Sequence, residues 1–103
     1  MRMMVRFSFA GEEANDLIRS GEIAKVLQMI MEDLKPEAAY FYPEGGDRAG
    51  MMVVDMKESS QLAEIAEPFF MGLNATVEMT PVMTAEDLQK GMANMQRIVD
   101  KYG

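Results

Sequence analysis

The sequence lacks cysteine and histidine altogether, and these two absences exclude much of the chemistry available to a small protein. Without cysteine there is no disulfide framework, thiol nucleophile, thiolate zinc site or iron–sulfur cluster. Without histidine the chain loses the commonest general base, the commonest transition-metal ligand and the usual proximal haem ligand. We therefore expect no metal and no other cofactor.

Basic residues are also scarce. The chain has ten Lys and Arg against 17 Asp and Glu, a formal net charge of -7, and the basic residues are scattered from Arg2 to Lys101. Nucleic acids and anionic membranes require clustered Lys and Arg, so we expect neither as a partner. No apolar run approaches the roughly 20 residues of a membrane span, and Arg6 and Ser8 interrupt the N-terminal apolar stretch. We therefore expect a cytoplasmic protein.

What the chain does contain is ordinary for a soluble domain. Its 103 residues are 49% apolar and 26% charged, which argues against disorder. A chain of this length buries about 65% of the surface that it exposes when unfolded. We find no linker, repeat or low-complexity segment and predict a single domain over residues 1–103.

Four segments alternate between apolar and more polar residues, the period of two that is typical of β-strands. In the first, Phe7 and Phe9 share one face, opposite Arg6 and Ser8. The expected strands are residues 3–10, 38–43, 50–56 and 75–83.

Helical periodicity separates these strands. It runs from Gly11 to about Lys35, with Ser20-Gly21 either breaking the segment or capping its second half, and Pro36 ending it. The next helix is expected to begin at a serine cap, Ser59 or Ser60.

Pro68 should kink or shorten this second helix, and Gly72 or Asn74 should end it. After the last strand, Thr84 and Asp87 have the spacing of a capping box. The helix that they open has one apolar stripe: Leu88, Met92, Met95, Val99 and Tyr102.

The order of elements is therefore βαββαβ with an added C-terminal helix, the pattern of an α+β ferredoxin-like domain. That fold has a four-stranded antiparallel sheet of order 4-1-3-2. The prolines agree with this order, because Pro43 and Pro81 fall in strands two and four, its two edges, and proline cannot donate to a central ladder.

The stretch "EGGDRA" (44–49) most resembles a ligand-binding loop, but it leads from one strand into another. A phosphate loop leads from a strand into a helix. Gly45 and Gly46 supply the positive backbone angles that a tight hairpin requires. We therefore predict a hairpin turn.

Helices cover only one face of such a sheet, so the other face is left bare. On that face we expect a mixed set: Met4, Arg6, Ser8, Tyr40, Tyr42, Met51, Val53, Asp55, Glu78, Thr80 and Val82. An exposed patch with this apolar content is typical of an interaction site. We predict an isologous homodimer with the two sheets face to face, the alternative being a solvated, tyrosine-rich face.

Five segments, in order, resemble a known family: "LKPEAAYF", the glycine-containing turn, "VVDM", "AEPFFMGLNA" and "PVMTAEDL". Over residues 21–90 the chain is similar to small bacterial proteins of unknown function that resemble the dimeric α+β barrel superfamily. The resemblance implies a homodimer of ferredoxin-like subunits. That superfamily includes cofactor-free monooxygenases, isomerases and haem-degrading enzymes. Several of these rely on histidine or tryptophan, which this chain lacks, so the resemblance transfers no catalytic residue.

The polar residues of the bare face form the candidate ligand site: Arg6, Ser8, Tyr40, Tyr42, Asp55, Glu78 and Thr80. Strands one and four should be neighbours, so Arg6 and Glu78 are expected to pair, with Ser8 and Thr80 alongside. One interpretation is a cavity between the two sheets that binds a small, partly apolar molecule. The favoured alternative is structural: the ion pair and the tyrosines only hold the dimer together.

A second function is a cofactor-independent isomerase or monooxygenase-like enzyme acting on an aromatic or polyketide-like acid. In that case Arg6 would bind the anionic substrate, while Asp55 or Glu78, buried and with a raised pKa, would be the base. Tyr40 or Tyr42 would donate the proton.

Overall fold

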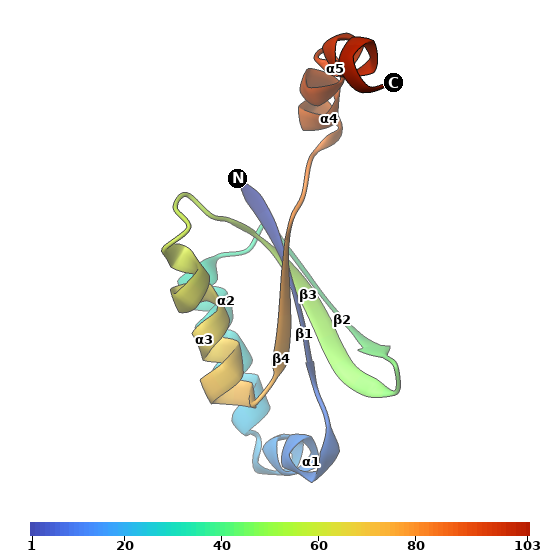
Figure 1. Ribbon diagram of the computed structural model, residues 1–103. Helices are drawn as coiled ribbons and strands as arrows, with labels where there is room; N and C mark the ends of the chain where they lie inside the picture. The colour runs from blue at the N-terminus through green and yellow to red at the C-terminus, as the bar shows by residue number, and fades with distance from the viewer.

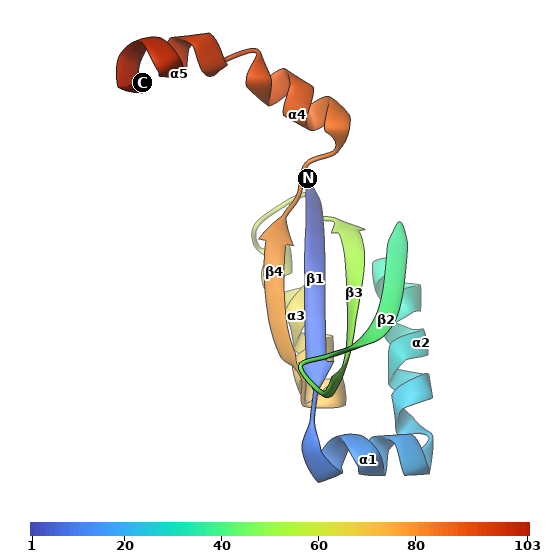
Figure 2. The same cartoon turned by 90° about the vertical axis from the view of Figure 1, so that its right-hand side faces the viewer.

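Four antiparallel strands form one sheet with the order β2-β3-β1-β4 (Figures 1 and 2). The computed structural model describes all residues from 1 to 103. The strands are β1 (Arg2–Phe9), β2 (Ala38–Glu44), β3 (Asp47–Asp55) and β4 (Thr76–Pro81). This is the predicted order read from the other edge, so the ferredoxin-like arrangement is confirmed, with both proline-containing strands at the edges.

Helices α2 (Glu22–Leu34) and α3 (Gln61–Leu73) lie on one side of the sheet, and α1 (Gly11–Ser20) connects β1 to α2. Figure 1 shows α2 and α3 against the sheet and α1 crossing beneath its lower end. The core lies between these layers and holds the predicted inward sets of the strands. Its most deeply buried side chains are Val5, Met52, Phe69 and Leu73.

Backbone conformation explains where the helices end. Gly21 adopts a left-handed conformation (φ 77°) and separates α1 from α2, as the sequence predicted. Lys35 ends α2 in the same conformation, directly before Pro36. Asn74, not Gly72, ends α3, which continues through Pro68 without being cut short there.

The predicted start of α3 at Ser60 is confirmed, but the serine side chain does not cap the helix. Ser60 occupies the cap position with helical angles and makes no capping hydrogen bond. Backbone carbonyls take its place: the N–H groups of Gln61 and Leu62 donate to the carbonyl oxygens of Glu58 (3.0 Å) and Ser59 (3.1 Å). The side chain of Gln61 instead orders the loop before the helix, where its Oε1 accepts from the N–H groups of Lys57 and Glu58.

The predicted hairpin turn is confirmed. β2 and β3 pair up to Glu44 and Asp47, so only Gly45 and Gly46 form the turn. Both have positive φ (60° and 86°), which is the requirement of a two-residue hairpin.

The C-terminal segment differs from the prediction. Two short helices, α4 (Ala85–Met92) and α5 (Met95–Tyr102), replace the single expected helix. The predicted capping box does open α4: the Asp87 backbone N–H donates to Thr84 Oγ1, and the Thr84 N–H donates to an Asp87 carboxylate oxygen, both at 3.1 Å.

Neither of these helices has a buried residue. Both stand beyond the end of the sheet (Figures 1 and 2). We call residues 84–103 the C-terminal arm. No helix in the structure combines the length and apolar content that a membrane crossing requires.

Candidate functional site

The sheet face opposite the helices carries no helix, and in Figure 2, which views it from that side, the turn of the β2–β3 hairpin crosses it in front of the lower end of β1. We call it the open face. The strand register arranges its side chains in three rows from β2 to β4. One row is Ala38, Val53, Met4 and Thr80; the next is Tyr40, Met51, Arg6 and Glu78; the third is Tyr42, Ala49, Ser8 and Thr76.

The register brings three of the predicted site residues together. Arg6 and Glu78 form the expected ion pair across β1 and β4. Ser8 lies one row away and shares a 2.7 Å hydrogen bond with the hydroxyl of Thr76, a residue that the prediction omitted. A small polar hollow of about 140 Å3 lies over this cluster.

Within the chain, only some of the hydrogen-bond donors of the Arg6 guanidinium have an acceptor. Its NH2 group donates to Glu78, but its Nε is buried and has no hydrogen-bond partner in the protein. A buried donor without an acceptor costs about 1–3 kcal/mol.

The other predicted residues lie apart from this cluster. Tyr40 is in the same row as Arg6, but Met51 stands between them, and Tyr42 is separated from Ser8 by Ala49. Thr80 belongs to the more apolar row of Met4. The register thus spreads the tyrosines and the ion pair over the whole width of the sheet.

The expectation that Asp55 is a buried base with a raised pKa is wrong. Asp55 is exposed at the end of β3, where its carboxylate lies 3.1 Å from the N-terminal ammonium group. This hydrogen bond and its charge hold the pKa of Asp55 below the ordinary value of 3.8. Asp55 is therefore an ion-paired carboxylate at neutral pH, and Glu78, also exposed, is paired with Arg6.

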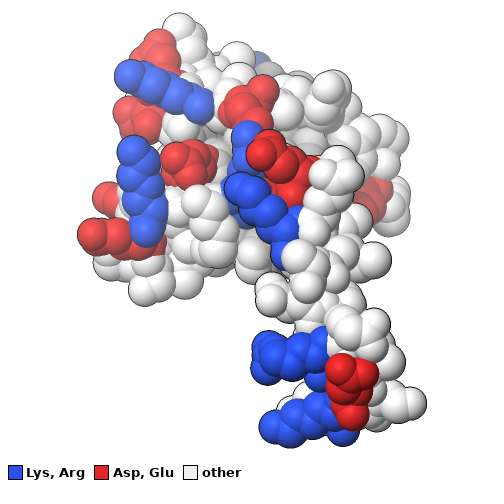
Figure 3. All heavy atoms as spheres, turned by 90° about the horizontal axis from the view of Figure 1, so that it is seen from above, with Lys and Arg blue, Asp and Glu red and all other residues white.

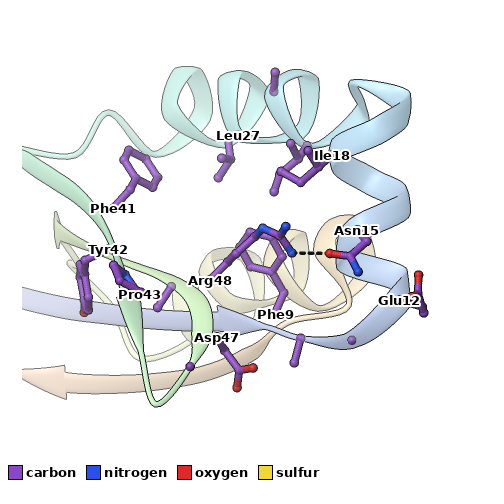
Figure 4. Close-up of a pocket in the computed structure, with 16 residues that line it drawn as sticks. Phe9, Glu12, Asn15, Ile18, Leu27, Phe41, Tyr42, Pro43, Asp47 and Arg48 are labelled. Atoms are coloured by element: carbon purple, nitrogen blue, oxygen red, sulfur yellow. Dashed lines mark hydrogen bonds between the residues drawn. The ribbon is translucent and has the colours of Figure 1, made fainter.

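A second, larger cavity lies on the helix side of the sheet and was not predicted. It is a groove of about 1010 Å3 between α1, the first half of α2 and the β2–β3 hairpin. We call it the hairpin groove. Its large apolar lining residues are Phe9, Ile18, Ile23, Leu27 and Phe41 (Figure 4).

Arg48 is the only basic residue that lines the hairpin groove. It is the second residue after the two-glycine turn and stands opposite Phe9 in the β1–β3 register, which places it on the helix side. Its NH1 donates to Asn15 Oδ1 of α1 at 2.9 Å, and Figure 4 shows the guanidinium between the hairpin and α1.

The sequence contained a signal for this groove that the prediction did not use. A two-residue turn fixes the alternation of the strand that follows, so Arg48 must share a face with Phe9 and Phe41. Charged residues are rarely buried, and Arg48 stays exposed, so it marks a part of this face that the helices leave open. The hairpin prediction was right about the glycines and overlooked the arginine beside them.

On the face shown in Figure 3, the charged side chains form no patch of one sign. At the end of the molecule shown in Figure 3, acidic and basic side chains are interspersed over the body and the C-terminal arm. No group of three or more acidic side chains is placed to hold a metal ion.

The model of one known family matches almost the whole chain. Residues 1–96 match the model of a family described as "Domain of unknown function (DUF3303)". No curated protein is significantly similar to the chain.

Proposed function

The chain belongs to the DUF3303 family, whose description assigns no activity, and we propose from its geometry that it is a homodimeric binding module. In this proposal two copies pack their open faces together, as in a dimeric α+β barrel. The observation that carries the proposal is the open face itself, where Met4, Met51 and Val53 are half-buried in a single chain and no helix covers them.

The size of the open face suits part of an interface. Four strands about 4.8 Å apart and six residues long at about 3.3 Å each give a face of roughly 19 by 20 Å, or about 400 Å2 in projection. A standard interface buries about 800 Å2 of accessible surface per partner. The sheet faces alone are therefore at the small end, and a stable dimer needs further contact.

The C-terminal arm supplies the further apolar surface. Its stripe is exposed along both helices: Leu88, Met92, Met95, Ile98, Val99 and Tyr102. Each helix has eight residues, whereas isolated helices shorter than about 12–15 residues are marginal in water. Packing against the second copy would stabilise both helices and bury the stripe.

The Arg6 cluster is the polar part of the proposed interface. A second copy, or a ligand between the sheets, would meet the part of the Arg6 side chain that stays exposed (39%), whereas its Nε is buried within the chain. Ser8, Thr76 and Glu78 surround this position. A small, partly apolar ligand with a hydrogen-bond acceptor would fit between two such clusters, with Tyr40 and Tyr42 at the β2 edge.

The enzymatic alternative receives less support. It requires a base with a raised pKa, and the pKa of Asp55 is lowered instead. Glu78 is exposed and paired with Arg6. We therefore favour binding over catalysis at the open face.

Native mass spectrometry and sedimentation velocity at micromolar concentration test the proposal. We expect a species of twice the 11.6 kDa chain mass, with any ligand seen as added mass. Val53→Glu places a charge in the more apolar row of the open face, directly opposite Met4. An unpaired charge buried in an interface costs about 3–5 kcal/mol, so the dissociation constant should rise by at least about 100-fold.

Met71→Glu is the matched control, because Met71 is 82% exposed on α3, on the opposite side of the molecule. It should leave the dimer unchanged, and circular dichroism should show both variants folded. A wild-type monomer, or equal dissociation constants for the two variants, would contradict the proposed interface.

A further inference from the structure

We propose that the hairpin groove binds a small organic acid, with an apolar body along the groove and a single carboxylate paired with Arg48. This site lies on the helix side of the sheet, opposite the proposed dimer interface. It can therefore exist whether or not the chain dimerises.

The groove has the dimensions and lining of a small-molecule site. Its volume of about 1010 Å3 is at the upper end of the roughly 300–1,000 Å3 typical of ligand pockets. Phe41 points toward Leu27 across the groove in Figure 4. Although Phe41 is on the helix-covered face, 55% of its surface is exposed, because no side chain fills the space beside it.

Arg48 gives the groove its chemical preference. Arg2, Arg6 and Arg19 each pair with a carboxylate of the chain, but Arg48 contacts only the neutral side-chain oxygen of Asn15. That contact holds the guanidinium beside α1 and leaves other N–H groups free. A guanidinium can donate two parallel hydrogen bonds to one carboxylate.

The surrounding charge limits the ligand to one negative charge. Asp47 and Glu12 also line the groove, and Figure 4 shows both carboxylates directed away from its interior. With one arginine, two acidic neighbours and a net charge of -7, the site would repel a polyphosphate. A monocarboxylate matches the one cation that lines the groove.

Two-dimensional NMR of the 15N-labelled full chain tests this inference with matched pairs of probes. Octanoate and 3-phenylpropanoate are the acids; 1-octanol and 3-phenylpropan-1-ol have the same bodies without the charge. We expect saturable shifts at the amides of Asn15, Leu27 and Phe41 with at least one acid. A hydrogen bond to a charged group predicts affinity for the matching alcohol about 10- to 100-fold weaker.

Arg48→Met should weaken binding of the acid by about the same factor and leave the alcohol unaffected. Arg48→Lys should restore part of the affinity. Arg97→Met is the matched control, because Arg97 is an exposed arginine of α5 far from the groove, and it should change neither. Three outcomes would overturn the proposal: shifts confined to the open face, no saturable shift with either acid, or equal affinity of the wild type for acid and alcohol. The comparison of acid with alcohol uses the wild type alone and therefore does not depend on any variant folding.

Discussion

At the scale of single residues, Gly50 decides how the aromatic part of the core packs. A Cβ at this position would lie 2.5 Å from Phe7 Cζ, 3.1 Å from Phe41 Cδ1 and 3.0 Å from the backbone oxygen of Tyr40. Phe7 cannot move away freely, because its ring also packs on Phe69 with centroids 4.7 Å apart. The absence of a side chain at Gly50 lets the two rings lie over the centre of β3.

Gly50→Ala should therefore destabilise the fold. Displacing two packed rings costs about 1–3 kcal/mol, which urea denaturation at fixed protein concentration would detect. Gly91→Ala is the control: a Cβ there has no neighbour within 4 Å, and alanine favours the helical conformation of α4. A midpoint for Gly50→Ala equal to that of the wild type would show that the rings relax without cost.

Residue pairs were predictable where strand alternation determines them. Arg6 and Glu78 could be paired from sequence, because adjacent strands with known inward faces leave few registers. Asp55 could not be placed correctly, because its partner is the ammonium group of Met1, which no apolar pattern locates. The same applies to Arg48, whose contact with Asn15 depends on the direction in which α1 turns after β1.

At the scale of elements, Gly72 sets the distance between α2 and α3. A Cβ at Gly72 would lie 2.7 Å from Val26 Cγ1, a side chain that is itself buried in the core. The two helices therefore approach closely at this point, and Gly72 is a spacer inside α3 and not the end of the helix.

This contact predicts non-additive substitutions. Gly72→Ala should cost about 1–3 kcal/mol because the added methyl overlaps Val26. Val26→Ala should also destabilise, by leaving a cavity. In the double variant the new methyl enters that space, so its destabilisation should be smaller than the sum of the two by at least about 0.5 kcal/mol in urea unfolding. Simple additivity would mean that α2 and α3 adjust independently.

Element types were predictable from periodicity, whereas the contacts between elements were not. The apolar stripe of residues 22–34 indicates which side of α2 faces the sheet, but nothing in it specifies Gly72 as the neighbour of Val26. The end of α3 shows the same limit. Gly72 and Asn74 both suit a left-handed cap, and only packing against α2 gives Gly72 a different role.

At the scale of the whole molecule, the chain is longer than a packed domain of its size. Its radius of gyration is 17.2 Å and its extents are 58 × 28 × 21 Å, whereas about 13 Å is expected for a compact chain of this length. The difference comes from the C-terminal arm. Its helical character was predictable from the apolar stripe, but the break into two helices was not. A stripe is also the same whether it packs on its own domain or on another chain.

Removing the C-terminal arm separates its contribution to the stability of the single chain from its contribution to the dimer. In the monomeric Val53→Glu background, deletion of residues 84–103 should change the free energy of unfolding by less than about 0.5 kcal/mol, since α4 and α5 bury no side chain in the body. In the wild-type background the same deletion should weaken the dimer. Full burial of two apolar side chains contributes about 3–6 kcal/mol, so we expect at least about a 100-fold rise in dissociation constant by sedimentation.

Leu88→Glu and Gln89→Glu test the stripe without deleting the arm. They introduce the same charge at adjacent positions of α4, one on the apolar stripe and one on the polar side. Only Leu88→Glu should weaken the dimer, because a charge at Leu88 must lose water when the stripe is covered. Equal effects of the two substitutions would mean that net charge, and not burial, governs association. Loss of folding when the arm is deleted in the monomeric background would instead place the arm against its own domain.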